Sequence, residues 1–107
     1  EGINFSIRTA EPADWETVAD FNCRLASETE GKNLDRSKID PGVKAVLGDP
    51  ARGVYCVAEA AGKIIGQLMI TREWSDWRNG WFWWIQSLYV QAECRKQGVF
   101  TALYRHV

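Results

Sequence analysis

The sequence predicts a single domain of α/β (α+β) class with a mostly antiparallel sheet, on two observations. The 107 residues are 46% hydrophobic and 25% charged, a balance typical of an ordinary globular domain. Along the chain, the spacing of apolar residues indicates a strand, two helices, three strands and a helix. Residues 1–107 are therefore expected to form one domain.

The first half of the chain predicts the strand and the two helices. Ile3 to Arg8 alternates apolar and polar residues, as a half-buried strand does. A helix from about Pro12 to Ala26 has its proline in the first turn and apolar residues at three- and four-residue steps. Ser27 to Lys38 is polar and predicts a loop. Asp40-Pro41 is expected to cap and begin a short second helix.

The second half predicts a three-strand meander and a final helix. Val54 to Ala58 and Ile64 to Thr71 form a hairpin, and Trp74 to Gly80 is a loop. Trp81 to Val90 is a strand apolar on both faces, which favours a place inside a layered sheet. From Gly98, apolar residues recur every four positions and predict a helix. The two faces of the third strand are expected to be Trp81, Trp83, Ile85 and Tyr89 on one side, and Phe82, Trp84, Leu88 and Val90 on the other.

Charge and cysteine usage narrow the function classes. A net charge of -1 provides no long-range field for a polyphosphate backbone, so nucleic acid is not expected as a partner. Three cysteines without a paired spacing, and a single histidine, argue against a zinc site or a disulfide framework. No apolar run reaches the ~20 residues of a membrane-spanning helix. We therefore expect a cytoplasmic protein with no metal and no membrane partner.

The segment from Leu88 to Thr101 carries the chemistry. A buried strand leads into a short loop with Arg95, Lys96 and Gly98, and then into a helix. The first turn of a helix presents N–H groups without internal partners, and glycine lets a phosphate approach them. A helix dipole contributes only ~0.3–1 kcal/mol, whereas micromolar binding needs about 8 kcal/mol. A phosphorylated cofactor with further contacts fits better than free phosphate.

The pattern Arg95-x-x-Gly98-x-Phe100 between a strand and a helix resembles the acetyl-CoA pyrophosphate loop of the GNAT-type N-acetyltransferases. In that family the pattern is Arg or Gln, two residues, Gly, one residue, then Gly or Ala. The element order also matches the GNAT-like β-α-α-β-β-β-α arrangement, truncated after the CoA-binding helix. The resemblance implies acetyl-CoA as the acetyl donor. The implied cofactor-binding residues are Leu88, Tyr89 and Val90 along the pantetheine arm, and Arg95, Lys96, Gln97, Gly98, Val99, Phe100 and Thr101 around the pyrophosphate.

Two departures from the family pattern affect what is expected. Phe100 narrows the space beside the pyrophosphate unless its ring turns inward onto the sheet. The family also continues through another strand, a helix and a final strand pair, and the later helix often supplies a tyrosine as general acid. Without that continuation, Trp81 to Val90 has an open edge, which predicts either a fragment or a homodimer through this edge.

Four residues are the candidates for binding the acceptor. Glu28 follows the first helix, beside the acceptor groove of the fold, and is either a base or amine-binding group or an exposed loop acid. Trp74 and Trp77 are either a recognition platform or packing. Gln86 cannot act as a base but can orient a water or the substrate. The catalytic residues stay unassigned.

The resemblance implies an N-acetyltransferase that transfers an acetyl group from acetyl-CoA to a primary amine by direct attack. The acceptor would be a small-molecule or peptide amine. The alternative is a non-catalytic GNAT-like module that binds CoA or dimerises.

Overall fold

One antiparallel sheet organises the computed structural model, which describes residues 4–95 and 97–106. The strands lie in the order β1, β2, β3, β4, and each pair of neighbours is antiparallel. This confirms the predicted fold class. The strands are β1 (Ser6–Thr9), β2 (Val54–Ala60), β3 (Lys63–Ser75) and β4 (Gly80–Val90); the helices are α1 (Trp15–Glu30), α2 (Arg36–Leu47) and α3 (Val99–His106), with short 3-10 turns η1 (Pro12–Asp14) and η2 (Ala92–Cys94).

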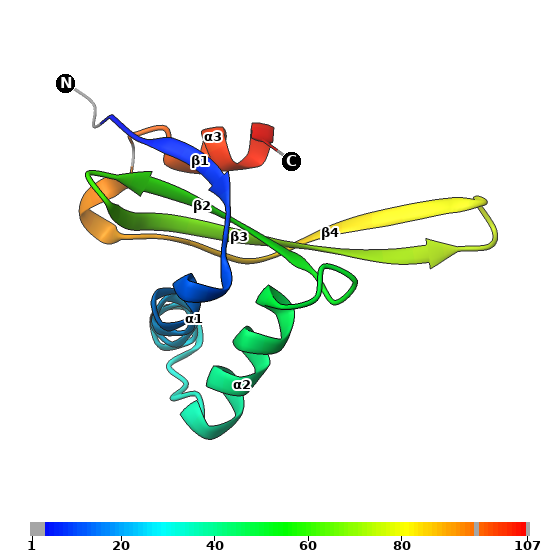
Figure 1. Cartoon of the computed structure of the whole chain (residues 1–107), viewed down its shortest axis with the longest axis horizontal. Helices are drawn as coiled ribbons and strands as arrows, with labels where there is room; N and C mark the ends of the chain where they lie inside the picture. Colours follow the sequence, from blue (N-terminus) through cyan, green and yellow to red (C-terminus); the bar gives the residue numbers. More distant parts are fainter. Residues whose placement is uncertain (1–3, 96, 107) are drawn as a thin grey trace.

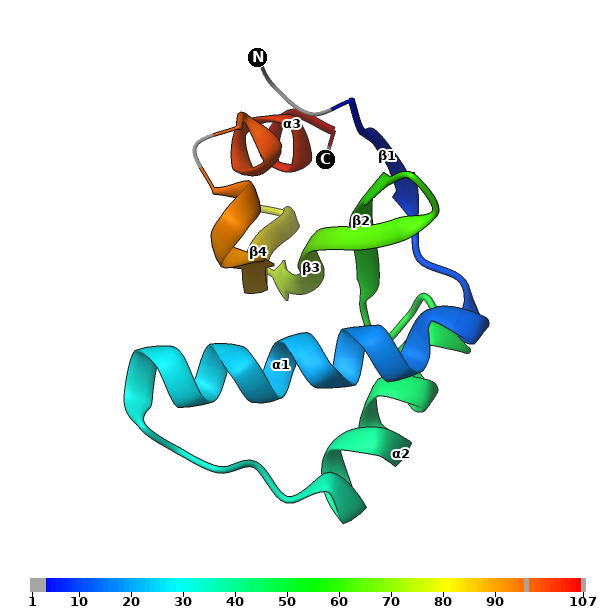
Figure 2. The same ribbon diagram turned by 90° about the vertical axis from the view of Figure 1, so that its left-hand side faces the viewer.

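The helices lie on both faces of the sheet, with α1 and α2 on one face and α3 on the other (Figures 1 and 2). Each face has its own apolar core. The core under α3 contains Cys56, Ala58, Ile65, Leu68, Ile70, Val90, Cys94, Val99 and Leu103. The core under α1 and α2 contains Val18, Ala19, Val43 and Tyr55. In the part of the chain that the structure describes, no helix has the length and apolarity of a membrane span.

Helix α1 extends four residues beyond its predicted end. It continues from Ala26 to Glu30, and Gly31 ends it in the left-handed conformation with a φ of 65°. The prediction of a loop beginning at Ser27 is therefore wrong. The polar last turn remains helical because Glu28 is bonded to side chains from other elements, a tertiary contact that a sequence pattern does not reveal.

The start of α2 also differs from its prediction. The side chain of Asp35 accepts a hydrogen bond from the Ser37 backbone N–H at 3.0 Å, so Asp35 caps the helix in place of the expected Asp40, which follows later in the chain. Asp40 instead pairs with Arg36 at 2.8 Å, and Pro41 lies inside the helix. The Asp40-Pro41 cap is therefore wrong, because a better-placed aspartate precedes it.

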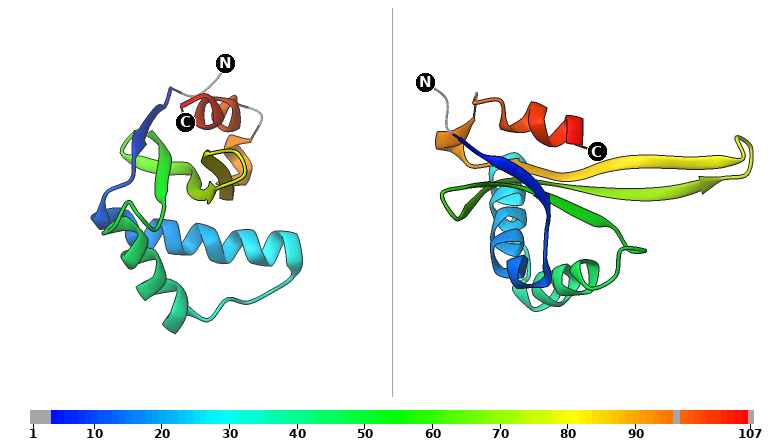
Figure 3. Two further views of the ribbon diagram at one scale, coloured as in Figure 1. Left: turned by 90° about the vertical axis from the view of Figure 1, so that its right-hand side faces the viewer. Right: turned by 45° about the horizontal axis from the view of Figure 1, so that its top comes forward.

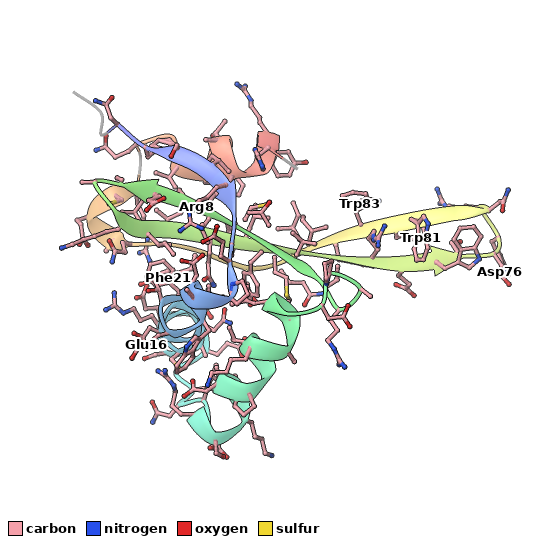
Figure 4. All side chains as sticks on the ribbon, in the orientation of Figure 1. Arg8, Glu16, Phe21, Asp76, Trp81 and Trp83 are labelled. Atoms are coloured by element: carbon pink, nitrogen blue, oxygen red, sulfur yellow. The ribbon has the colours of Figure 1, made fainter. Side chains whose placement is uncertain are left out.

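Strand β4 is an edge strand of the described sheet, as the predicted open edge requires, but residues 81–86 are exposed on both faces, so the predicted place of the strand inside a layered sheet is wrong for this part. The β3–β4 hairpin projects beyond the helices as a two-stranded ribbon (Figures 1 and 3). Its side chains have no helix to pack against, and Trp81 is 55% exposed and Trp83 62% exposed. Figure 4 shows both tryptophans on this ribbon and Asp76 near its tip.

A β-bulge at Ser87 divides β4 into two parts. Ser87 has a φ of 54°, and the register with β3 shifts between Gln67 and Met69. The bulge reverses which residues share a face. Tyr89 packs on Phe21 of α1, whereas Trp83 lines a pocket on the side of α3. The predicted grouping of Tyr89 with Trp83 is therefore wrong, because strict alternation does not cross a bulge.

Candidate cofactor site at the junction of β4 and α3

A pocket of about 290 Å³ lies where the chain leaves β4 and enters α3. It contains most of the residues that the sequence predicts around the cofactor. The lining residues are Val90, Cys94, Arg95, Gly98, Val99, Phe100 and Thr101. Among the other predicted residues, Leu88 packs against the core under α3, Gln97 is exposed, and Lys96 lies outside the described residues.

Gly98 shapes the entrance to α3. Its φ is 82°, a conformation that favours glycine, and no atom of the described residues beyond its chain neighbours lies within 4 Å of the position that a Cβ would occupy. The Ala102 N–H donates to the Gly98 carbonyl at 3.0 Å and is the first N–H of α3 to make an intrahelical bond. The N–H groups of Val99, Phe100 and Thr101 come before it and have no acceptor within the helix. The open space over these N–H groups suits a phosphate oxygen.

The open edge of β4 borders the same pocket. The Gln91 N–H donates to the Ile65 carbonyl of β3 at 2.9 Å. Because neighbouring residues of an antiparallel ladder face opposite ways, the polar groups of Val90 point away from β3. Arg95 Nε donates to the Val90 carbonyl at 2.8 Å, which orients the loop against this edge.

Glu28, Tyr89 and Arg95 form a second cluster beside the pocket, although Glu28 is far from the other two in sequence. The Tyr89 hydroxyl donates to Glu28 Oε2 at 2.6 Å, and Arg95 Nη2 donates to Glu28 Oε1 at 2.8 Å. The Arg95 guanidinium also lies over the Tyr89 ring, 5.3 Å from its centre.

The electrostatics of this cluster follow from its pairing. The Arg95 guanidinium, followed by the Tyr89 hydroxyl, lowers the pKa of Glu28. Burial, followed by the bond to Glu28, raises the pKa of the Tyr89 hydroxyl. Glu28 is therefore an ionised carboxylate and a weak base. Because it pairs with Arg95, it offsets part of the positive charge that Arg95 was expected to bring to the anion site.

The remaining predicted acceptor residues lie elsewhere on the molecule. Gln86 Nε2 donates to Thr71 Oγ1 at 2.7 Å. Trp74 packs edge-on against Trp81 with ring centres 5.2 Å apart, and Trp77 is 95% exposed in the turn of the ribbon. Within residues 4–95 and 97–106, no hydrogen bond joins Trp74, Trp77 or Gln86 to Glu28.

Sequence reasoning missed a polar network between α1 and the bulge of β4. Gln67 is fully buried, and its Nε2 donates to Asn22 Oδ1 and to the Ser87 carbonyl. Asn22 Nδ2 in turn donates to the Tyr55 hydroxyl at 3.0 Å. The available signal was a glutamine in the middle of an apolar strand, which must find hydrogen-bond partners when buried.

Two further side chains of the pocket, Phe100 and Cys94, affect what it can bind or do. The Phe100 ring is 49% exposed and lies 6.0 Å from the Tyr104 ring on the outer side of α3, so it does not turn inward onto the sheet. Burial, followed by the charge of Glu93, raises the pKa of the Cys94 thiol. That thiol is therefore not activated as a nucleophile.

Comparison with known proteins identifies the family. The model of the acetyltransferase (GNAT) family matches residues 14–107. A possible acetyltransferase from Clostridium difficile 630 shares 49% sequence identity at a TM-score of 0.89, covering 95% of this chain and 67% of that chain. No curated protein matches the sequence.

More distant structures share the fold. A predicted acetyltransferase with acetyl-CoA from Clostridium acetobutylicum is 20% identical at a TM-score of 0.81, with coverage of 96% of this chain and 70% of that one. An aminoglycoside acetyltransferase from an uncultured soil metagenomic sample is 14% identical at a TM-score of 0.71, with coverage of 97% and 69%. The chain spans about two thirds of the length of these structures. On the family match over most of its length, together with the predicted motif and fold, the chain belongs to the GNAT acetyltransferase family.

Proposed function

We propose that the chain binds acetyl-CoA and takes part in transferring its acetyl group to a primary amine. The observation that carries this proposal is the pocket between the open edge of β4 and the first turn of α3, where Gly98 leaves space over unpaired N–H groups. The N–H groups from Gln97 to Thr101 would hold the pyrophosphate. The pantetheine arm would pair with the β4 edge from Leu88 to Val90.

The reaction we propose is direct attack. The amine nitrogen forms a bond to the acetyl carbon and the carbon–sulfur bond breaks, while the proton lost by the nitrogen passes through water to the leaving CoA thiolate, which is released as the thiol. Backbone donors of β4 would polarise the thioester carbonyl, and holding the two reactants together supplies much of the rate increase.

The acceptor in this proposal is a small-molecule or peptide amine. Glu28 supports this class because an ionised carboxylate attracts an ammonium group. Gln86 would orient a water or the acceptor, and Trp74 and Trp77 would offer aromatic surface. An aminoglycoside acetyltransferase with the same fold is one example of an acetyltransferase with an amine-bearing substrate.

The second candidate is a non-catalytic module that binds CoA without turnover. It is favoured by the pairing of Glu28, whose lowered pKa makes it a weak base. The two candidates share the cofactor site and differ only in whether an amine is acetylated, so release of free CoA thiol in the presence of amines distinguishes them.

Two further proposals concern assembly and location. We propose that a second copy of the chain pairs with the distal part of β4, from Gly80 to Gln86, which the cofactor leaves free. An antiparallel edge can pair with its own copy about a two-fold axis. The free thiols of Cys23, Cys56 and Cys94 support a cytoplasmic location, because a reducing compartment maintains them.

Calorimetric titration with acetyl-CoA tests the cofactor proposal. We expect micromolar binding by the chain and its loss in Gly98→Glu, which places bulk and negative charge over the phosphate position. Gly62→Glu is the matched control, because Gly62 has a similar φ of 77° and open space but lies outside the pocket. Equal affinity in Gly98→Glu and Gly62→Glu, or no binding by the folded chain, would contradict the proposal.

A further inference from the structure

Gln67 occupies an unusual position at the centre of the sheet. Its relative exposure is 0%, and it is the buried polar side chain among otherwise apolar core residues of the described chain. It lies in β3, between the bulge of β4 on one side and β2 on the other. Burying a polar side chain costs free energy unless it is hydrogen-bonded, whereas an apolar side chain would pack there without partners, so the presence of a glutamine needs an explanation.

The amide of Gln67 connects two elements. Nε2 donates to Asn22 Oδ1 of α1 at 2.9 Å and to the Ser87 carbonyl of β4 at 3.1 Å. A backbone carbonyl only accepts hydrogen bonds, so the nitrogen of the amide must face Ser87. Gln67 therefore ties the bulged residue of β4 to α1.

The other end of the amide has no partner in the described part of the protein. Gln67 Oε1 is buried and accepts no hydrogen bond from the described residues. A buried acceptor without a partner lowers stability and offsets part of what the two Nε2 hydrogen bonds contribute. A residue kept at some cost in stability is expected where it serves a site.

The contact with Ser87 lies at a conformation that needs support. Ser87 is not glycine, yet its φ is 54°, which is uncommon for a residue with a side chain. The bulge it forms sets the direction of the next residues, Leu88 to Val90, of which Val90 lines the pocket described above.

We propose that Gln67 is a positioning residue for the cofactor: it holds the Ser87 bulge against α1 and so orients the β4 edge along which the pantetheine arm lies. The inference rests on the proposed function, because that function places the pantetheine arm along this edge. The holding of the bulge itself is a property of the free protein and is tested separately.

The fold should tolerate loss of the amide. Asn22 and Ser87 both line a pocket of about 240 Å³ that is open at the surface, so water can donate to their oxygens when Gln67 is replaced. The Gln67→Met variant retains the length of the side chain, removes both donors, and also removes the unpaired Oε1.

The experiment compares Gln67→Met with a core variant, Val43→Ala, in which a buried residue of α2, outside the cofactor pocket, is shortened. We expect Gln67→Met to weaken acetyl-CoA affinity about tenfold in calorimetry, with a melting temperature equal to or above that of the parent chain. Val43→Ala should melt at a lower temperature with unchanged affinity. Parent-like affinity in Gln67→Met would overturn the inference, and so would an equal loss of affinity in Val43→Ala.

Amide hydrogen exchange in the absence of cofactor provides the second measurement. We expect the N–H groups of Tyr89 and Gln91, which face β3 just after the bulge, to exchange about tenfold faster in Gln67→Met, while those of β2 are unchanged. Unchanged exchange at the bulge would overturn the inference. If the parent chain fails to bind acetyl-CoA, the proposed function fails, and the exchange rates still decide whether Gln67 holds the bulge.

Discussion

At the scale of single residues, Glu28 connects parts of the chain that are far apart in sequence. It accepts from Tyr89 at 2.6 Å and from Arg95 at 2.8 Å, so it joins the last turn of α1 to the end of β4 and to the loop before α3. Sequence reasoning identified Glu28 as a candidate for the acceptor but did not identify its partners, because 61 and 67 residues separate them from it.

The first prediction concerns the charge of Glu28. The Glu28→Gln variant keeps an oxygen that can accept from Tyr89 but removes the negative charge that attracts an ammonium group. We expect the KM for the best acceptor in a panel of amines to rise about tenfold, with a smaller change in the Kd of acetyl-CoA.

Glu30→Gln is the matched control for this prediction, because Glu30 lies in the same helical turn and pairs only with Lys32 at the surface. Its kinetics should equal those of the parent chain. Turnover is measured as release of CoA thiol, and affinity by calorimetry. An equal loss of acetyl-CoA affinity and of acceptor affinity in Glu28→Gln would show that Glu28 has a structural role instead.

At the scale of elements, α3 sits close to the sheet because β3 carries a glycine beneath it. A Cβ on Gly66 would lie 2.9 Å from Val99 Cγ1 and 3.3 Å from the Tyr89 carbonyl. Contacts this short force one element to move. Since Val99 lines the cofactor pocket, the position of α3 on Gly66 also sets the shape of that pocket.

The second prediction follows from this contact. Gly66→Ala should destabilise the protein by roughly 1–3 kcal/mol through overpacking. Gly42→Ala, in the exposed part of α2 with no atom near the new Cβ, should instead stabilise it by roughly 0.5–1 kcal/mol. Denaturant unfolding measures both, and a Gly66→Ala variant as stable as the parent chain would show that α3 can shift freely.

The third prediction concerns the connection of β1 to η1. Arg8 donates to both oxygens of Asp14, at 2.8 and 3.1 Å, and to Glu59 at 2.9 Å. The bond from Arg8 lowers the pKa of Asp14. A carboxyl whose pKa is lowered on folding stabilises the protein above its unfolded pKa of about 3.9, and that stabilisation disappears as the pH falls through the folded value.

Replacing Arg8 should therefore have a pH-dependent effect. We expect Arg8→Gln to cost roughly 1–2 kcal/mol at pH 7. The difference from the parent chain should shrink as the pH falls below about 4 and Asp14 becomes protonated in both proteins. Thermal unfolding over this pH range measures it, and a difference that stays constant with pH would contradict the role of the Asp14 charge.

At the scale of the whole molecule, the β3–β4 ribbon accounts for an elongated shape with principal extents of 46 × 32 × 27 Å. Both faces of the ribbon carry exposed aromatic rings, and its β4 side is an open strand edge. Such an edge is a template for pairing with another strand. The exposed large apolar residues of β4 are Trp81, Phe82, Trp83, Trp84 and Ile85.

The fourth prediction tests the proposed dimer through this edge. Light scattering coupled to gel filtration should give about twice the chain mass of 12.2 kDa for the parent protein. Trp83→Lys places a charge on the face of the paired strands and should yield monomers. Trp77→Lys, in the turn beyond the strands, should remain a dimer. A monomeric parent chain at every concentration would rule out this assembly.

The sequence predicts turns and helix starts better than features that depend on contacts between distant residues. The β2–β3 turn at Ala61-Gly62 and the entry of α3 at Gly98 agree with the sequence patterns, since each depends on residues within one turn. The cap of α2 was misplaced because Asp35 and Asp40 carry the same signal, and only one of them receives the Ser37 N–H. The bulge at Ser87 left no pattern, because serine has no preference for a positive φ.

The sequence by itself determined the order of the elements, the antiparallel class and the family motif from Arg95 to Phe100, because apolar periodicity and turn chemistry act over a few residues. Only the tertiary structure decided that Glu28 meets Arg95, that Gln67 supports the bulge, and that the aromatic ribbon stands exposed. These features depend on which distant segments pack together. Such contacts arise from the folded chain as a whole, so no local pattern encodes them.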